Sequence, residues 1–274
     1  MKGGEEDDLD MYVEDYGEDA VKKKLFYNLG SGGSFQHPAW TNVDIPSDWY
    51  DGKIDIPLDF ETLQPLPIEH GTAEVIYTAH TLEHLSQEAA NNLLKCAYQI
   101  LKPGGVLRIV LPDVDYYWAN YLAKNTKDFY LCNVNEDTVS LKLKHSPKDI
   151  SIEQGFLYEV VSSACSAIDM DFESPISTDE FIRAAKEKDF VDLLNWCVDH
   201  VDARAHSDLK MLGFHRNWWN RTKLRECLVQ AGFSKSNILD STFGQSSQRV
   251  LRNTRYFDLG STYQQISLYV EAHK

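Results

Sequence analysis

Short apolar segments alternate with one helix-patterned segment over residues 25 to 111, and this alternation restricts the chain to few folds. The apolar runs have the length of buried strands and lie at residues 25–29, 41–45, 54–58, 73–79 and 106–111. Between the last two runs, residues 87–101 repeat apolar side chains at helical spacing, and a Lys-Pro-Gly-Gly turn ends that helix. Strands that alternate with helices are typical of a parallel α/β sheet. We therefore expect a Rossmann-like, doubly wound, mostly parallel sheet.

The alternation stops between about residues 116 and 213 and then resumes. The interruption contains polar loops and a helical stretch, 178–201, that is rich in aromatic and charged residues, so we interpret it as an inserted helical cap. A helix at 221–231 then precedes a strand near Ile238 and a last strand at 265–272. A closing pair of strands of this kind predicts an antiparallel edge on the C-terminal side of the sheet.

The beginning of the chain differs from the rest in charge. Residues 1–20 contain nine acidic residues and one lysine, a net of −8 within a formal net charge of −15. We interpret residues 1–23 as a flexible acidic leader, with a partner-docking arm as the alternative. Residues 24–274 are expected to form a single domain that carries the cap. The body is also acidic and has no basic stripe, so we expect no nucleic-acid partner.

Cysteine usage and hydropathy limit where the protein is expected to work. The five cysteines are widely separated and contain no CxxC pair, which argues against a disulfide framework and against a thiolate zinc site. No apolar run approaches the roughly 20 residues of a membrane span, and the N-terminus lacks the pattern of a signal peptide. We expect a cytoplasmic protein without membrane insertion.

A glycine-rich turn follows the first expected strand. Asn28 lies in that strand, and Gly30, Ser31 and Gly32 lie where a doubly wound sheet leaves a crevice for a ligand. Glycine lets a ligand approach the backbone closely, although a turn that binds nothing would have the same composition. A dinucleotide fingerprint needs glycine at the position of Phe35, and the GK[ST] ending of a phosphate-binding loop is absent. A ligand without phosphates is therefore favoured.

Two aspartates follow the next two expected strands. Asp44 can accept hydrogen bonds from both hydroxyls of a ribose, or it can begin a turn before Pro46. Asp59 can accept a hydrogen bond from an adenine amine, or it can cap a short helix before Glu61. Only ten residues, 35–44, separate the glycine turn from the end of the second strand, whereas a crossover with a helix needs a dozen or more. The first crossover is therefore expected to be unusually short.

Several segments in this order resemble class I S-adenosylmethionine (SAM)-dependent methyltransferases. AEVIYTAH from residue 73, HTLEHL from residue 80 and LKPGGVLRIVLPDVD from residue 101 are similar to the fourth strand, the following helix start and the fifth strand of that family. FHRNWWNRTKLRECLVQAGF and ISLYVEAHK look like the closing helix and last strand of bacterial predicted methyltransferases associated with glycan and cell-surface biosynthesis. The resemblance covers roughly residues 24–120 and 213–274.

The resemblance implies SAM as the cofactor and assigns residues to its parts. It assigns the methionine part to Gly30, Ser31 and Gly32 in the glycine turn, and the ribose to Asp44 at the end of the second strand. It assigns the adenine to Asp59 and Phe60 after the third strand, and the sulfonium to Ala79 and His80 at the end of the fourth. Asn28 belongs to the same set, and it replaces an acidic residue common in the family. We therefore expect the amino group of SAM to be held differently here.

The same resemblance implies transfer of a methyl group to a small-molecule or carbohydrate acceptor. Such a displacement requires an oxygen or nitrogen nucleophile aligned behind the methyl group, and a hydroxyl nucleophile must also lose its proton. His80 is the first candidate for that base, although it could instead be a wall residue that contacts SAM. Asp113 and His215 are the second candidates. Trp218 and Trp219 could line the acceptor site or pack in the core.

Three other functions compete with this interpretation. The sequence HTLEH at 80–84 matches the inverted zinc-protease motif, with Glu159 as a possible third ligand. We expect no metal, because the motif follows a buried-type strand and leads into the LKPGG turn, as in the methyltransferases. A nucleotide-dependent oxidoreductase or sugar-modifying enzyme would use the same sheet but lacks its third glycine here. A non-catalytic SAM-binding or interaction protein would keep the cofactor residues without turnover.

Overall fold

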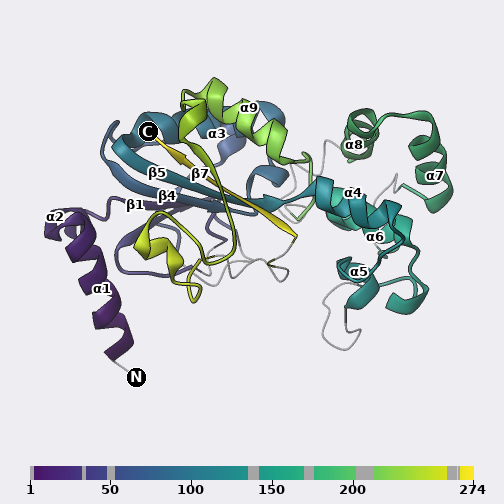
Figure 1. Ribbon diagram of the computed structural model, residues 1–274, viewed down its shortest axis with the longest axis horizontal. Coiled ribbons are helices and arrows are strands. Elements are labelled where there is room, and N and C mark those ends of the chain that lie inside the picture. The colour runs from purple at the N-terminus through teal and green to yellow at the C-terminus, as the bar shows by residue number, and fades with distance from the viewer. Residues whose placement is uncertain are drawn as a thin grey trace. The chain divides into compact units, whose positions relative to one another are not determined.

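The computed structural model describes residues 3–32, 35–47, 53–134, 142–169, 176–201, 213–257, 264 and 266–274. The chain divides into two compact units. Unit 1 comprises residues 1–82, 87–111 and 221–274, and unit 2 comprises residues 83–86 and 112–220. Unit 1 contains the sheet, whereas unit 2 is helical (Figure 1). Among the helices that are described, none combines the length and the apolar character needed to cross a bilayer.

Unit 1 is built on a sheet whose seven described strands have the order β3-β2-β1-β4-β5-β7-β6. Strands β1 to β5 pair in parallel, and β6 pairs antiparallel with β7. The prediction of a mostly parallel sheet that closes with an antiparallel strand pair is confirmed. The strands are β1 (Phe26–Leu29), β2 (Trp40–Asp44), β3 (Ile56–Pro57), β4 (Ala73–Ala79), β5 (Leu101–Pro112), β6 (Ile238–Ser241) and β7 (Ser267–His273).

The strands follow the apolar runs of the sequence, with two local differences. The pairing of β4 with β5 shifts from Ala73 opposite Leu101 to Val75 opposite Val106, so the Lys-Pro-Gly-Gly segment forms an irregularity within β5. The sequence predicted that segment as a turn between a helix and a strand. At the other end of the sheet, β7 lies between β5 and β6, so the edge position belongs to β6. Residues 242–266 connect the two strands of this pair.

Two amphipathic helices cover one face of the sheet in unit 1. Helix α3 (Gln87–Ile100) and helix α9 (Arg221–Ala231) contact each other and lie side by side in Figure 1. The apolar positions of α3, spaced three and four residues apart, are buried against the sheet, as the periodicity predicted. The observed helix bounds agree with the predicted ones to within one residue at each end.

The opposite face is covered by segments that the sequence patterns did not predict to be helical. The acidic leader forms α1 (Gly3–Tyr16) and α2 (Glu18–Lys22), and Tyr12 of α1 is only 1% exposed. The Trp40 indole Nε1 donates a hydrogen bond to the Tyr12 hydroxyl at 2.8 Å, and Ala20 of α2 joins the same core. The leader therefore packs against the sheet, in contrast to the flexible segment expected from its charge.

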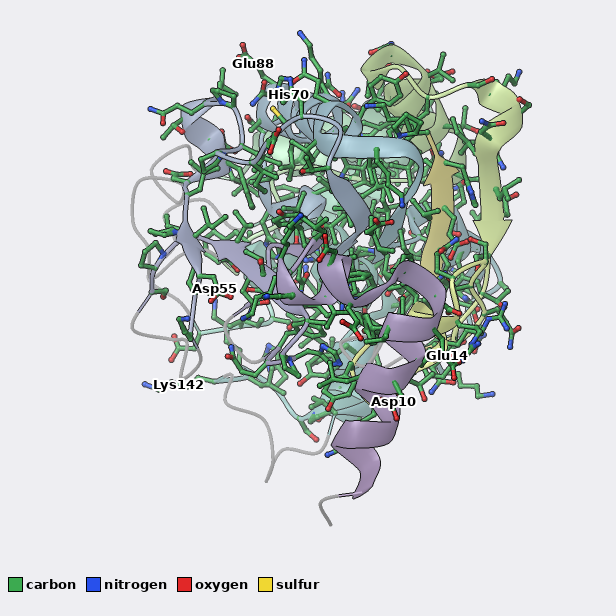
Figure 2. All side chains as sticks on the ribbon, turned by 90° about the vertical axis from the view of Figure 1, so that its left-hand side faces the viewer. Asp10, Glu14, Asp55, His70, Glu88 and Lys142 are labelled. Atoms are coloured by element: carbon green, nitrogen blue, oxygen red, sulfur yellow. The ribbon has the colours of Figure 1, made fainter. Side chains whose placement is uncertain are left out.

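The connection between β6 and β7 covers the same face as α1. Its short 3-10 helix η8 (Arg249–Arg252) places Val250 and Leu251 in the core that contains Tyr12, and Phe257 packs there too. Glu14 on α1, labelled in Figure 2 together with Asp10, forms an exposed ion pair with Arg249 at 3.2 Å. No helix lies among the described residues between β1 and β2, in agreement with the short crossover that was predicted.

Unit 2 is a helical unit with an aromatic core. It contains α4 (Val114–Leu122), α5 (Tyr130–Asn133), α6 (Ile152–Val161), α7 (Thr178–Glu187) and α8 (Phe190–Asp199). The helical stretch predicted over 178–201 consists of two helices, and the Asp189 carboxylate, which accepts a hydrogen bond from the Asp192 amide at 2.9 Å, begins α8. Unit 2 begins and ends a few residues outside the predicted cap and includes residues 83–86.

Short 3-10 helices connect several of these elements. They are η1 (Phe60–Thr62), η2 (Leu82–His84), η3 (Pro147–Asp149), η4 (Ser162–Ala164) and η7 (Lys235–Asn237), in addition to η8. Two of them matter for the sites described below: η1 follows β3, and η2 follows β4 after a gap of two residues.

Candidate functional site

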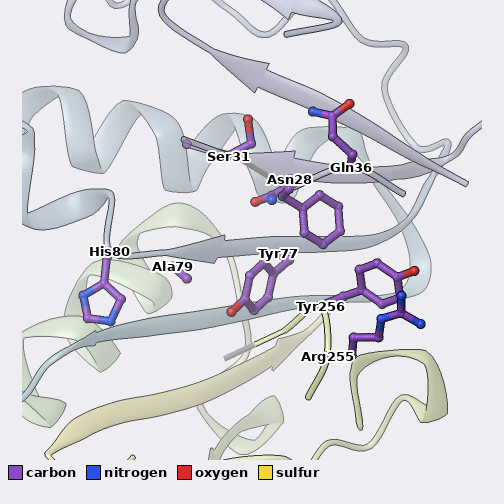
Figure 3. A pocket seen from close by; sticks show the side chains of 10 residues that line it. Asn28, Ser31, Gln36, Tyr77, Ala79, His80, Arg255 and Tyr256 are labelled. Carbon is purple, nitrogen blue, oxygen red and sulfur yellow. The ribbon is translucent and has the colours of Figure 1, made fainter. Parts of the chain in front are cut away.

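A pocket of about 370 Å³ lies in unit 1, and we refer to it as the strand-end pocket (Figure 3). Its walls come from β1 and the turn after it, from β4 and the residue that follows, and from the connection before β7. The described lining residues are Asn28, Gly30, Ser31, Phe35, Gln36, Tyr77, Ala79, His80, Arg255 and Tyr256. The pocket therefore forms near the carboxyl ends of two neighbouring parallel strands, where ligands bind in open α/β sheets.

The register of the sheet explains why the strand residues face one pocket. Asn28 of β1 lies directly beside Tyr77 of β4, so both side chains project from the same face of the sheet. Ala79 is two residues further along β4 and shares that face. Asn28 is 3% exposed and brings an amide into the wall beside the Tyr77 ring.

Contacts with neighbouring residues determine the conformation of the glycine turn. Gly30 has a φ of 77°, and its amide donates to the Val43 carbonyl at 2.8 Å. A side chain at this position would overlap the side chain of Thr81, whose hydroxyl lies 3.3 Å from the carbonyl oxygens of Leu29 and Gly30. Glycine is thus required at position 30 both by the backbone conformation and by the close approach of Thr81.

Asp44 holds the turn to the end of β2. One carboxylate oxygen accepts the Gly32 amide at 2.7 Å, and the other accepts the Ile45 amide at 2.7 Å. Asp44 does not appear among the described residues that line the strand-end pocket.

The structure shows Asp59 in a capping role. Its carboxylate accepts the Glu61 amide at 3.0 Å and begins η1, and the neighbouring Phe60 is buried. Helix capping is one of the two roles considered for Asp59 from the sequence. Like Asp44, neither Asp59 nor Phe60 is among the described lining residues.

The polar atoms of the strand-end pocket suit a polar ligand. The Ser31 hydroxyl oxygen is buried and has no hydrogen-bond partner among the described residues. Burying a hydroxyl without a hydrogen-bond partner costs free energy, so a ligand that forms a hydrogen bond with Ser31 would gain affinity. The Ser31 hydroxyl, the Asn28 amide and the rings of Phe35 and Tyr77 together suit a cofactor such as SAM, which has polar groups and an aromatic base.

His80 combines a strained backbone with a place in the pocket wall. It follows the last residue of β4, its φ is 52°, and its amide donates to the Val110 carbonyl at 3.0 Å. Left-handed backbone is unfavourable for a residue with a side chain, and it persists only where neighbouring contacts impose it. Figure 3 shows the imidazole beside Ala79 at one end of the pocket.

The other two candidate bases belong to unit 2. The Asp113 carboxylate accepts the Asp115 amide at 3.1 Å and caps α4. The Nδ1 atom of His215 lies 3.1 Å from the Glu159 carbonyl oxygen. His80 is the one of the three candidates that lines the strand-end pocket, as far as the described residues go.

Trp218 and Trp219 are core residues of unit 2. Trp219 is 1% exposed and Trp218 is 7% exposed, and the Trp218 indole donates to the Asn195 side chain at 2.8 Å. Of the two roles considered from the sequence, the structure shows core packing for both.

The inverted zinc-protease motif is not formed as such. That motif requires two histidines on one helix, whereas His80 directly follows a strand and His84 lies in the 3-10 helix η2. The carboxylate of Glu159, considered as a third ligand, accepts the Tyr130 amide at 2.7 Å.

Five of the ten described residues that line the strand-end pocket were not predicted as site residues from the sequence. Tyr77 could have been found, because it lies two residues before Ala79 and therefore on the same face of β4. Gln36 and Phe35 follow the glycine turn directly and could have been included with it. No local pattern points to Arg255 and Tyr256, which reach the pocket from the long connection between β6 and β7.

A family profile matches the segment that contains part of this site. Residues 50–109 match a family described as a methyltransferase domain, a segment that includes β4, α3 and most of β5. Over these residues the chain is similar to methyltransferase domains, and the pocket residues Tyr77, Ala79 and His80 lie within the match. No curated protein matches the chain in sequence.

Several solved structures are similar to this chain at low sequence identity. A SAM-dependent methyltransferase from Archaeoglobus fulgidus is 12% identical, with 97% of this chain and 93% of that chain covered and a TM-score of 0.40. One from Mesorhizobium loti is 12% identical, with 91% and 90% covered and a TM-score of 0.41. Human N-acetylserotonin methyltransferase in complex with SAM is 13% identical, with 96% and 53% covered and a TM-score of 0.36.

Proposed function

We propose that this chain is a methyltransferase that binds SAM in the strand-end pocket and transfers its methyl group to an oxygen, or a nitrogen, of a small-molecule or carbohydrate acceptor. The supporting observation is that five residues chosen from the sequence line one pocket in the structure. They are Asn28, Gly30, Ser31, Ala79 and His80. The pocket lies near the carboxyl ends of β1 and β4, the part of a doubly wound sheet that serves ligand binding.

Each part of SAM has a proposed contact. The turn from Gly30 to Gly32 contacts the methionine part, where the Ser31 hydroxyl offers a hydrogen bond. Asn28 contributes an amide in place of the acidic side chain found in related enzymes. Asp44 accepts hydrogen bonds from the ribose through its carboxylate, and Asp59 with Phe60 lies near the adenine.

The proposed chemistry needs alignment and removal of one proton. SAM supplies an electrophilic methyl group, and the protein places the acceptor atom behind it while excluding water. His80 accepts the proton of a hydroxyl acceptor through its imidazole. Asp113 and His215 are the alternative bases, because both lie in segments that resemble methyltransferase sequences.

The sequence also supports a proposal for the acceptor class and the cellular location. The resemblance to methyltransferases associated with glycan and cell-surface biosynthesis supports a carbohydrate acceptor, and the cysteine pattern supports a cytoplasmic location. The acidic composition argues against a nucleic-acid acceptor.

Calorimetry with SAM, S-adenosylhomocysteine and NAD tests the cofactor assignment. We expect the first two to bind and NAD not to bind. Ala79→Leu narrows the pocket and is expected to weaken SAM binding, whereas Ala123→Leu, at an exposed alanine of unit 2, leaves it unchanged. Binding of NAD in preference to SAM would overturn the proposal in favour of an oxidoreductase.

A labelled-methyl screen tests the transfer step. The protein is incubated with SAM carrying a labelled methyl group and with glycan and metabolite extracts, and transfer to a carbohydrate or small-molecule fraction is expected. Intact SAM binding with no transfer to any fraction would favour a non-catalytic SAM-binding protein.

A further inference from the structure

Unit 2 brings together three side chains with metal-binding chemistry. One potential ligand atom from each of Glu83, His84 and His215 lies within 4.8 Å of those of the other two. We propose that these three residues form a binding site for a divalent transition-metal ion. The proposal does not depend on the methyltransferase assignment, because none of the three residues lines the strand-end pocket.

Backbone hydrogen bonds orient both imidazoles for coordination. The Nδ1 atom of His84 lies 2.9 Å from the Phe214 carbonyl oxygen, and that of His215 lies 3.1 Å from the Glu159 carbonyl oxygen. A carbonyl oxygen only accepts, so both Nδ1 atoms must carry a proton. A neutral imidazole protonated at Nδ1 coordinates metals through Nε2, and a backbone carbonyl on the other nitrogen is the usual second partner of a metal-bound histidine.

Main-chain contacts hold the two contributing segments together. The Glu83 carbonyl accepts hydrogen bonds from the amides of Arg216 and Asn217, at 2.8 and 3.0 Å. The ring centroids of His84 and His215 are 5.0 Å apart. The backbone therefore holds the ligand residues close together before a metal ion binds. This lowers the entropic cost of ordering their side chains on binding.

Burial and charge also fit a cation. Glu83 is 2% exposed, and a cation beside a buried carboxylate interacts with it more strongly than it would in water. The two histidines are only half-buried, so solvent can reach the cluster and water can complete the coordination of the ion.

The donor set favours first-row transition metals. Two imidazole nitrogens and one carboxylate form the combination that binds Zn²⁺ in His₂Glu sites and Fe²⁺ in two-histidine, one-carboxylate sites. Mg²⁺ and Ca²⁺ prefer oxygen ligands throughout. The set differs from the inverted zinc-protease motif, which would use His80 with His84, and it departs from the absence of a metal that was expected from the sequence.

Titration of the chelator-treated full chain with Co²⁺ and Zn²⁺ tests the proposal. We expect one Co²⁺ per chain, with visible absorption bands that report nitrogen and oxygen coordination and that Zn²⁺ removes. His84→Ala and His215→Ala should each weaken binding by at least about tenfold, the lower end of the effect of losing even an outer-shell partner. His145→Ala, at an exposed histidine of the same unit, should bind as the natural chain does.

A second measurement keeps the test valid if an alanine variant folds poorly. Glu83→Gln preserves the size of the side chain but removes its charge, and it should weaken Zn²⁺ binding while circular dichroism stays native. Zn²⁺ should also raise the melting temperature of the natural chain, because it binds the folded state. Absence of Co²⁺ and Zn²⁺ binding by the natural chain, or equal affinity in all variants, would overturn the proposal. SAM calorimetry on the metal-free chain reports on the strand-end pocket separately.

Discussion

His80 is the residue at which backbone strain and proposed chemistry coincide. Replacement by asparagine suits the test, because asparagine tolerates the left-handed conformation that the structure shows at φ 52°. We expect His80→Asn to lower turnover at least about 100-fold, since general-base catalysis contributes that much or more. SAM affinity should stay nearly unchanged in calorimetry.

The exposed His70 provides a matched control for His80. It lies in the same unit, and His70→Asn should leave both turnover and SAM binding as they are. Unchanged turnover in His80→Asn would remove His80 from the role of base and would leave Asp113 and His215 to be tested in the same way.

Asp44 is expected to act on SAM binding through its charge. Asp44→Ala removes the acceptor of the Gly32 and Ile45 amides together with the proposed ribose contact. Loss of charge-assisted hydrogen bonds should weaken SAM at least about tenfold in calorimetry. The exposed Glu88 supplies the control Glu88→Gln, which should bind SAM normally.

The ribose contact of Asp44 can be separated from its role in the turn. If Asp44 binds the ribose hydroxyls, a 2′-deoxy analogue of S-adenosylhomocysteine should lose affinity for the natural chain but much less for Asp44→Ala, because the two changes remove the same interaction. Equal losses for the two proteins would contradict the ribose assignment and would leave Asp44 with the turn alone.

At the scale of elements, α1 is expected to contribute to stability through Tyr12. Tyr12→Phe removes the hydroxyl that accepts the buried indole N–H of Trp40 and should cost about 1–3 kcal/mol in the free energy of unfolding. Denaturant unfolding followed by fluorescence measures this difference. Glu14→Gln, which breaks an exposed ion pair of the same helix, should change stability by less than about 1 kcal/mol. Equal midpoints for both variants would contradict a structural role of α1.

The elements also show where sequence patterns succeed. Helix α3 was predicted closely because its apolar residues repeat at helical spacing and the sequence Lys-Pro-Gly-Gly follows shortly after it. Helix α1 has a weaker pattern because acidic residues dominate it, although Tyr12 is buried and Leu9, Met11 and Tyr16 pack against the same core. Its packing depends on Trp40, which lies 28 residues further along the chain. The spacing of apolar residues within a helix does not indicate contacts between residues so far apart in sequence.

At the scale of the whole molecule, one buried ion pair connects β5 with β7. Arg108 is fully buried, and it donates to Glu271 at 3.0 Å and to the carbonyl oxygens of Gln245 and Thr242. Burial by itself raises the pKa of the Glu271 carboxyl. Hydrogen bonds from Ser246 and Ser247 and the charge of Arg108 outweigh burial and hold that pKa below its usual value.

Glu271 should therefore make the fold sensitive to acid. A carboxyl whose pKa is lower in the folded state stabilises the protein above its unfolded pKa of about 4.3, and that contribution is lost as the pH falls through the folded value. Glu271→Gln should lower stability at neutral pH by about 3–5 kcal/mol, because it leaves the buried charge of Arg108 without the carboxylate that balances it.

Unfolding followed from pH 7 into the acid range checks both expectations. The natural chain should lose more stability below pH ~4.3 than Glu271→Gln does. Glu69→Gln, at an exposed glutamate, should follow the natural chain. Parallel curves for the natural chain and Glu271→Gln would contradict the role of this carboxyl.

The sequence by itself determined the parts of the molecule that depend on neighbouring residues. Apolar runs predicted the strands, periodicity predicted α3 and α9, and the glycine turn with His80 pointed to one end of the sheet. These features are local because a strand or helix is encoded in the spacing of its own side chains.

Tertiary structure alone decided which distant residues meet. Tyr256 reaches the pocket opposite Asn28, Tyr12 reaches Trp40, and His215 reaches His84. Each of these contacts closes a loop whose path depends on the packing of all the elements between its ends, and that packing leaves no periodic signal in the sequence.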